Sequence, residues 1–471
     1  MAEDEYLTPA ELREVLGISQ ATYYRWLKEG KLRGVRAGRT WRFARSVAQD
    51  LLRDGDPGVE EARRVCQARL GALAEARGEK TTMPDDVIQL LIEHALRRQA
   101  TDLHIEPVAD GVAVRERVHG ILAPLEPALP ADARTAILSA LRERAGLDAP
   151  PDRPQQGRFF FAFEGRRVDV RASTYPTGLG ESVALRLLDP AAITVDLDAL
   201  GFGAKLVAAT RQALRSAKGV FLVNGPTGAG KSTTLYSCLV ELAAPGRKVM
   251  TAEDPVELHL DGLLQANVGP EMGFCDAMYA MLRNDLDVGM VSEVRDGQTM
   301  RLLFQVANTG HVMLSALHAP DAATALHRLL GIGEIEPRLV VENLLGVLDQ
   351  RLLVCVCPAC RGARPATKEH AEWLSLTKAQ RRSPVAYGEG CPECDDSGVA
   401  GRTAVGALLT LDKGLAAAIE AGTTAPEALT ELFPGDYRGL RHAVLDRLFA
   451  GDVTVPSAAA ALGSLTRSPG A

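Results

Sequence analysis

A glycine-rich loop between a strand and a helix constrains this chain more than any other feature. The loop runs Gly225-Pro-Thr-Gly-Ala-Gly-Lys-Ser232 and fits the pattern G-x-x-x-x-G-K-[ST]. The apolar run 219–224 before it predicts a buried strand, and residues 233–242 after it predict a helix. In that order, loop N–H groups and a helix N-terminus form a phosphate cradle. We expect the cradle to consist of Gly225, Pro226, Thr227, Gly228, Ala229, Gly230, Lys231, Ser232 and Thr233.

Two side chains of this loop carry most of the expected chemistry. Lys231 is expected to reach the β- and γ-phosphates of a nucleotide such as ATP, and Ser232 is expected to bind Mg²⁺. A chance glycine turn is the alternative. The strand before the loop and the helix after it argue against that alternative.

The composition limits the class of protein. The chain has 471 residues, which favours three domains of roughly 150 residues each. The formal net charge is −7, so a nucleic-acid partner would need a local basic patch. No apolar run approaches the roughly 18 residues of a membrane span, and the acidic N-terminus does not resemble a secretory signal. Eight cysteines in so long a chain fit a reducing cytoplasm better than a disulfide scaffold.

Residues 1–55 predict a separate small module. Helix start signals at Thr8 and Ser19 are followed by a hairpin pattern over 31–43. Eight basic residues and one acid lie in the stretch 25–45, with Trp26 and Trp41 among them and Tyr23 and Tyr24 directly before it. This winged helix-turn-helix pattern resembles the excisionase/MerR-type DNA-binding domains.

The resemblance of this module implies duplex DNA as a partner. A recognition helix over 19–29 would lie in a major groove, and the arginine-rich wing would contact phosphates. An adaptor that keeps this fold and binds protein is the alternative. The sequence leaves both readings open.

The remainder of the chain changes its pattern several times. We expect a multidomain α/β protein with a linker over 56–84, an α+β (PAS-like) domain over 85–190, a P-loop domain over 191–355 and a metal module over 356–402. Alternating strand and helix patterns in the P-loop domain predict a mainly parallel sheet covered on both faces. The last part, 403–471, is expected to hold helices up to residue 450 and an alanine-, serine- and glycine-rich, disordered tail after Val455. Within the α+β domain we expect a helix over 85–98 and strands over 112–118, 158–164 and 166–173.

Three further blocks of candidate residues follow the P-loop. Glu253 comes soon after a short strand, where a carboxylate can hold Mg²⁺ or orient a water. Glu293 comes at the carboxyl end of an apolar strand, where a carboxylate can act on an attacking water. His311 and His318 lie on either side of another apolar strand. Each block alone is a weak signal.

In order and spacing, the P-loop and these three blocks closely resemble the secretion ATPases of type II secretion and type IV pilus assembly. They match that family's Walker A, Asp box, Walker B and His box. The resemblance extends over about 85–405 and includes upstream segments at 100–107, 171–181 and 186–188. It implies a RecA-like ATPase that works as a homohexamer, with ATP between two core domains.

The resemblance also implies roles for single residues. Glu293 would be the catalytic carboxylate, and Glu253 would lie near the metal or the water. His311 and His318 would respond to the nucleotide state. Arg171 and Arg186 are candidates for contact with the γ-phosphate, because arginines stabilise a transferring phosphoryl group. Ordinary ion pairing is the alternative for these two arginines.

Four cysteines have the spacing of a metal site. The pairs Cys357/Cys360 and Cys391/Cys394 form C-x₂-C…C-x₂-C with a gap of 30 residues. Tetrahedral Zn²⁺ accepts four thiolates and then has no open position, which predicts a structural zinc site. The gap is longer than in most zinc ribbons, but the resembled family carries a four-cysteine zinc module here.

The resemblance implies a motor that is cytoplasmic and peripheral at the inner membrane, where an inner-membrane platform protein would be its partner. The zinc module favours the extension and secretion branch of the family. The alternative is an ATPase-coupled DNA-binding regulator, or a DNA-uptake motor, that uses residues 1–55 on DNA.

Overall fold

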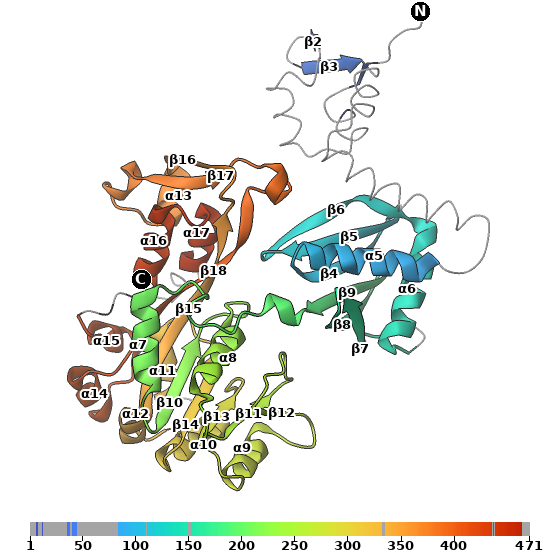
Figure 1. The fold of residues 1–471 in the computed structure, drawn as a ribbon. Coiled ribbons are helices and arrows are strands. Elements are labelled where there is room, and N and C mark those ends of the chain that lie inside the picture. The colour runs from blue at the N-terminus through green and yellow to red at the C-terminus, as the bar shows by residue number, and fades with distance from the viewer. Residues whose placement is uncertain are drawn as a thin grey trace, which may run out of the picture. The chain divides into compact units, whose positions relative to one another are not determined.

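The computed structural model describes residues 6–7, 12, 35–37, 40–44, 83–109, 111–148, 152–331, 335–435, 437 and 439–463. The chain divides into two compact units, shown in Figure 1. The first comprises Met1–Ala192 with Glu389–Gly398, and the second comprises Ile193–Gly388 with Val399–Ala471. Each unit has a hydrophobic core of its own.

The N-terminal module is described only in part. Its strands β1 (Tyr6–Leu7), β2 (Val35–Ala37) and β3 (Thr40–Ala44) form a small antiparallel sheet in the order β1-β3-β2. Strands β2 and β3 pair as the predicted hairpin. Apart from Leu12, which is helical and buried, the helices predicted for this module lie outside the described residues, as does the linker up to residue 82.

The first unit contains a six-stranded antiparallel sheet in the order β6-β5-β4-β9-β8-β7. Apolar residues of two helices join the sheet in one core. The elements are α5 (Met83–Arg97), β4 (Ala100–Val108), β5 (Gly111–Val118), β6 (Ile121–Pro130), α6 (Ala131–Ala145), β7 (Gln156–Phe163), β8 (Arg166–Thr177) and β9 (Gly180–Leu188). The predicted helix and the three predicted strands are all present, and the α+β class is confirmed.

The second unit is built on a seven-stranded sheet in the order β12-β11-β13-β14-β10-β15-β18. The strands are parallel except β18, which runs antiparallel to β15. The elements are α7 (Ala204–Leu214), β10 (Gly219–Asn224), α8 (Lys231–Leu242), β11 (Val249–Glu253), β12 (Leu264–Asn267), α9 (Phe274–Leu282), β13 (Val288–Val291), α10 (Gly297–Asn308), β14 (Val312–Leu317), α11 (Ala322–Leu330), α12 (Pro337–Asn343), β15 (Leu344–Val356) and β18 (Val399–Leu409).

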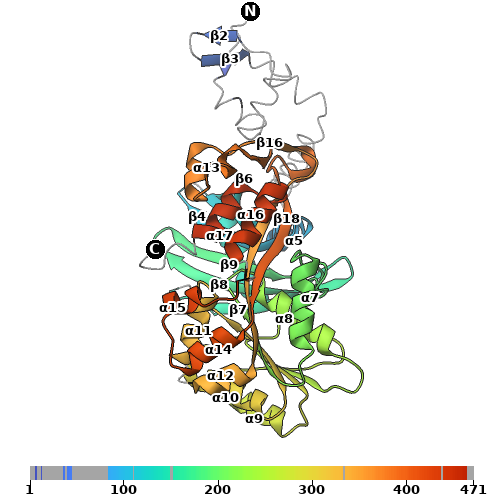
Figure 2. The ribbon, with the colours of Figure 1, turned by 90° about the vertical axis from the view of Figure 1, so that its left-hand side faces the viewer.

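Helices cover both faces of this sheet, as Figure 2 shows. The apolar side chains of α7 and α8 pack on one face, and those of α9 to α12 pack on the other. Every residue of β10, β13 and β14 is buried for this reason. The prediction of a mainly parallel sheet covered on both sides is therefore confirmed. None of the helices in the described residues is long and apolar enough to cross a membrane.

The C-terminal part differs from the expected run of helices in two places. Residues 403–409, expected to be helical, belong to β18, because their small apolar side chains extend the sheet beside β15. Val455–Gly463, expected to be disordered, is helix α17, because its valine, alanine and leucine side chains bury themselves in a local core. The other elements are β16 (Arg361–Pro365), α13 (Lys368–Trp373), β17 (Pro384–Gly388), α14 (Lys413–Glu420), α15 (Pro426–Glu431) and α16 (Leu440–Ala450).

Candidate functional site

The glycine-rich loop connects β10 to α8, as its sequence predicts. The strand ends at Asn224 and the helix begins at Lys231. Gly228 and Gly230 have φ angles of 78° and 82°, in the left-handed region that favours glycine. These two residues let the loop turn tightly and lead directly into the helix N-terminus. Pro226, Thr227 and Gly228 of the loop are exposed, as is Ser232 in the first turn of α8.

Lys231 lies inside this loop and is buried, with 8% of its surface exposed. Its Nζ donates to the carbonyl oxygens of Gly225 and Pro226, each at 2.9 Å. Nζ also lies 3.2 Å from Nδ1 of His318, the residue that follows β14. Burial lowers the pKa of Lys231 to about 8, against the opposing attraction of Glu293. The lysine predicted to bind phosphate is thus held at the centre of the loop.

His318 connects Lys231 to Glu293. Its Nε2 lies 2.9 Å from Oε2 of Glu293. An ammonium group only donates and a carboxylate only accepts, so Nδ1 is the acceptor and Nε2–H is the donor of a neutral imidazole. Side chains from the start of α8 and from the loops after β14 and β13 therefore form one hydrogen-bonded chain. It lies at the carboxyl edge of the parallel strands, where sites in such sheets occur.

Glu293 has cationic as well as neutral partners. Partial burial raises its pKa, but hydrogen bonds from His318 and Arg295 outweigh burial and leave the pKa below its ordinary value. Arg295 is in close contact with Glu293 and also lies 3.3 Å from Asp254. Glu293 is therefore ionised at neutral pH, which is the form that a general base requires.

Glu253, the last residue of β11, has a different environment. Only 2% of its surface is exposed. Its Oε1 accepts hydrogen bonds from Thr251 at 2.6 Å and Gln265 at 3.1 Å, and its Oε2 accepts one from Tyr236 at 2.5 Å. Both carboxylate oxygens are thus bonded to neutral donors, and no described hydrogen bond joins them to Lys231. The predicted role of Glu253 near the metal or the water stays a prediction.

His311 lies at the other end of β14 from His318. Its Nδ1 is 3.0 Å from Oγ1 of Thr309 and 3.1 Å from the carbonyl oxygen of Val306. Its own carbonyl accepts from the N–H of Gly219, the first residue of β10. A strand of six residues separates the two histidines, which is about 20 Å. The structure therefore brings His318, and not His311, to Lys231.

Arg171 and Arg186 lie in the first unit as cross-strand partners on β8 and β9. Arg171 Nε is 3.7 Å from Asp169, and Arg186 Nε is 3.0 Å from Asp102. The arginines thus have acidic partners within their own unit, as the ion-pair alternative predicts. Their contact with a γ-phosphate stays a prediction.

The structure brings all four predicted cysteines together. Their sulfur atoms lie within 4.8 Å of one another. Cys357 and Cys360 follow β15, and the N–H of Gly398 donates to Sγ of Cys394 at 3.2 Å. Zinc–sulfur bonds of about 2.3 Å in a tetrahedron place sulfur atoms about 3.8 Å apart. Cys357, Cys360, Cys391 and Cys394 therefore suit a zinc ion.

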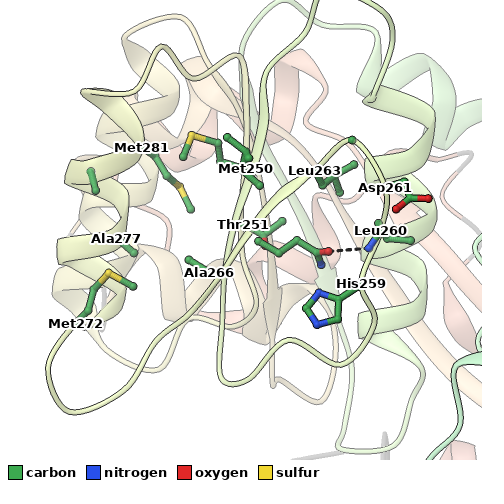
Figure 3. A pocket seen from close by; sticks show the side chains of 14 residues that line it. Met250, Thr251, His259, Leu260, Asp261, Leu263, Ala266, Met272, Ala277 and Met281 are labelled. Carbon is green, nitrogen blue, oxygen red and sulfur yellow. Dashed lines mark hydrogen bonds between the residues drawn. The ribbon is translucent and has the colours of Figure 1, made fainter. Parts of the chain in front are cut away.

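A separate cavity of about 550 Å³ lies beside edge strand β12 and helix α9 (Figure 3). Met250, Met272 and Met281 give it an apolar wall, while Thr251 and Gln265 contribute polar groups. Among the described residues that line the cavity, none comes from the P-loop. The phosphate cradle is therefore a different place on the same sheet.

Sequence reasoning missed a row of buried polar residues beneath the P-loop. Asp349, Gln350 and Arg351 follow one another on β15, and each is at most 3% exposed. Gln350 Nε2 donates to the carbonyl oxygen of Ala229 at 2.7 Å, and its Oε1 accepts from Thr234 at 2.8 Å. The available signal was three consecutive polar residues inside an otherwise apolar strand.

Comparisons with known sequences agree with this geometry. Residues 78–459 match the family described as Type II/IV secretion system protein, and residues 6–47 match the helix-turn-helix domain family. The chain is 38% identical over 373 residues to Type II secretion system protein E of Dickeya dadantii (strain 3937), which covers 78% of this chain and 73% of that relative. It is 38% identical over 344 residues to the Type IV pilus assembly ATPase PilB of Thermus thermophilus, covering 72% of this chain and 38% of that relative.

Two solved structures share the fold. The Legionella pneumophila ATPase DotB has a TM-score of 0.61 at 18% identity, covering 82% of this chain and 97% of that chain. The pilus retraction motor PilT with bound ADP has a TM-score of 0.52 at 23% identity, covering 79% and 96%. The predicted fold class, a RecA-like P-loop core preceded by an α+β domain and a helix-turn-helix, is thereby confirmed.

Proposed function

The chain belongs to the Type II/IV secretion system protein family and is an ATPase, and we propose that it powers type IV pilus assembly or type II protein secretion. The motor is a homohexamer at the cytoplasmic face of the inner membrane, and it acts on an inner-membrane platform protein. The observation that carries this proposal is the chain of contacts from Lys231 through His318 to Glu293. It joins a phosphate-binding cation to a candidate general base.

The roles of the residues follow from their chemistry. Lys231 binds the β- and γ-phosphates of ATP, and Ser232, which is exposed, would hold Mg²⁺, an ion that neutralises phosphate charge when bound. Glu293 orients and deprotonates the attacking water, and its ionised state suits that task. His318 responds to the nucleotide because it contacts both Lys231 and Glu293. Arg171 and Arg186 contact the γ-phosphate from the first unit.

The test of the enzyme is turnover of Mg-ATP by the purified full-length chain. Lys231→Ala is expected to abolish nucleotide binding, and Glu293→Gln is expected to retain binding while losing hydrolysis. Wild-type turnover in both variants would contradict the assignment. The same assay on Arg171→Ala and Arg186→Ala separates phosphate contact from ion pairing. A strong loss of kcat is expected if the arginine contacts phosphate, and a small loss if it only forms an ion pair.

The test of the motor is capture of the tagged protein from its own cells, with and without nuclease. Recovery of an inner-membrane platform protein that nuclease does not remove is the expected result. Recovery of defined DNA fragments without such a protein would contradict the motor and favour the regulator.

We assign the four-cysteine cluster a structural zinc ion. Four thiolates complete a tetrahedral shell, so the ion has no position left for a substrate. The experiment is metal analysis of the purified chain. One equivalent of zinc is expected in the wild type and none in Cys394→Ser, while an equal zinc content in both would contradict the site.

A second candidate function concerns the N-terminal module. The helix-turn-helix match over 6–47 and the basic stretch over 25–45 favour binding of duplex DNA. In that case the chain is a DNA-binding regulator or a DNA-uptake motor coupled to the ATPase. The full-length chain is expected to bind duplex DNA with an affinity that falls steeply as the salt concentration rises. An affinity that does not change with salt, or no binding at low salt, would exclude this function.

A further inference from the structure

The side chain of the residue before the P-loop forms hydrogen bonds with the segment that follows β14. Asn224 is completely buried at the end of β10. Its Oδ1 accepts from the N–H of Ala319 at 2.8 Å, and its Nδ2 donates to the carbonyl of the same residue at 3.2 Å. Ala319 directly follows His318. One side chain therefore fixes both backbone groups of the residue next to the histidine.

Asp349 supports Asn224 from the neighbouring strand. The two residues are register partners on β10 and β15, and Nδ2 of Asn224 donates to Oδ1 of Asp349 at 2.5 Å. The backbone N–H of Ala322 also hydrogen-bonds to Asp349. The carboxylate, which is 1% exposed, thus connects the strand before the P-loop with the start of α11.

Two arginines hold the same segment at other points. Arg328 donates to the carbonyl oxygen of His318, and Arg351 donates to that of Pro320 at 2.6 Å. The backbone from His318 to Ala322 is therefore held by side chains from β10, β15 and α11. A connecting segment usually takes its backbone hydrogen bonds from water. Here side-chain donors and acceptors take that place, and those of the buried Asn224 would be costly to leave unpaired.

This arrangement fixes the position of an imidazole that needs two partners at once. The nitrogens of His318 lie 3.2 Å from Lys231 and 2.9 Å from Glu293. A shift of about 1 Å in the backbone would break one of these contacts, and such shifts are costly in enzymes. We propose that Asn224 and Asp349 are positioning residues that hold His318 in place for ATP hydrolysis. The inference rests on the proposed role of this site in hydrolysis.

The experiment is a double-mutant cycle on the full-length ATPase at saturating Mg-ATP. Asn224→Ala is expected to lower kcat about tenfold with little change in KM, because it disturbs the reacting geometry more than binding. His318→Ala is expected to lower kcat at least as much. The double variant is expected to equal His318→Ala alone, since Asn224 acts through that histidine. A merely structural effect of Asn224 would instead multiply with that of His318.

A matched control is another buried asparagine of the same unit, the last residue of helix α12. Asn343 is 1% exposed and donates to the carbonyl of Leu339, at the opposite edge of the sheet. Asn343→Ala is expected to keep kcat within about twofold, because it loses a side chain of the same kind far from His318. The proposal is overturned if Asn343→Ala matches Asn224→Ala, if the two effects multiply, or if His318→Ala leaves kcat unchanged.

Asp349→Asn keeps the test valid if Asn224→Ala does not fold. In the amide, one of the two acceptor oxygens of the carboxylate is replaced by an N–H₂ donor, which weakens the hold of residue 349 on Asn224 and Ala322. Asp349→Asn is expected to lower kcat about threefold in the wild type. The same substitution is expected to leave kcat unchanged when it is added to His318→Ala. A fall in both backgrounds would overturn the proposal. Absent turnover in the wild type would instead overturn the proposed function, so the two failures are distinct.

Discussion

Two glutamates at the same edge of one sheet are held in opposite ways. Glu253, at the end of β11, is enclosed by the neutral donors of Tyr236, Thr251 and Gln265. Glu293, after β13, contacts Arg295 and His318 and is more exposed. A carboxylate with all its acceptors bonded to buried neutral groups stabilises a fold. A carboxylate held by charged and titratable groups can exchange its partners when a ligand brings new charge.

The largest expected effect is on Glu293. Glu293→Gln is expected to lower kcat about 10²- to 10⁴-fold, because the amide cannot accept a proton from the attacking water. Steady-state hydrolysis of Mg-ATP measures this, with nucleotide binding as the control for folding. A glutamine variant with more than a tenth of wild-type kcat would remove the proposed contrast between the two glutamates.

The next effect separates the two ends of β14. His318→Ala is expected to lower kcat about tenfold, since it breaks the connection between Lys231 and Glu293. His311→Ala is expected to change kcat less than twofold, because His311 bonds only to its own edge of the sheet in the contacts described above. Turnover of both variants under the same conditions makes the comparison. Equal losses would mean that the site extends along the strand.

A smaller effect is expected at Glu253, and on stability more than on rate. Glu253→Gln places an amide N–H₂ among hydroxyl and amide donors, which costs about 1–3 kcal/mol for a buried group left unsatisfied. Urea denaturation of the variant and the wild type measures the loss. Unchanged stability with a large loss of kcat would instead support the predicted role of Glu253 near the metal or the water.

The smallest effect concerns a third carboxylate, that of Asp349. It tests whether burial alone explains the difference between Glu253 and Glu293. Burial raises the pKa of Asp349 from 3.8 to about 7, while Asn224, Arg351 and the N–H of Ala322 act to lower it; Asp321 also raises it. The folded chain therefore binds this proton more tightly than the unfolded chain. The resulting stability is complete below about pH 4 and is lost as pH rises through about 7.

Asp349→Asn has no such proton to lose. Between pH 5 and pH 8, the midpoint of thermal unfolding is expected to fall a few degrees further in the wild type than in this variant. Tyr437 faces the same carboxylate, and the raised pKa that burial gives its phenol keeps it neutral over this range. Parallel pH curves for the two proteins would show that the charge of Asp349 is fully compensated.

The local parts of the site could be predicted from the sequence. The P-loop, its strand and its helix are contiguous, so their pattern is complete within about 25 residues. The strand between His311 and His318 was predicted for the same reason. Which of the two histidines meets Lys231 depends on how β14 pairs with β10, where Leu317 is the register partner of Asn224. The local pattern around each histidine does not contain that pairing.

The long-range parts could not be predicted. Asn224 and Asp349 lie 125 residues apart, and they meet only because β10 pairs with β15. The enclosure of Glu253 depends in the same way on Tyr236 of α8 and Gln265 of β12. In the tail, an alanine-rich composition suggested disorder, whereas the spacing of Val455, Ala458 and Leu462 allowed a helix to pack.

The way in which Lys231 is held has a consequence for ligand choice. An ammonium group has three N–H donors, and here Gly225, Pro226 and His318 provide three acceptors for them. All three N–H donors of Lys231 are used in these contacts. An anion can therefore bind the ammonium group only by displacing one of the three acceptors. A hydrogen bond to a charged group contributes about 1.5–3 kcal/mol, so the new contact between Nζ and the anion has to offset a loss of that size.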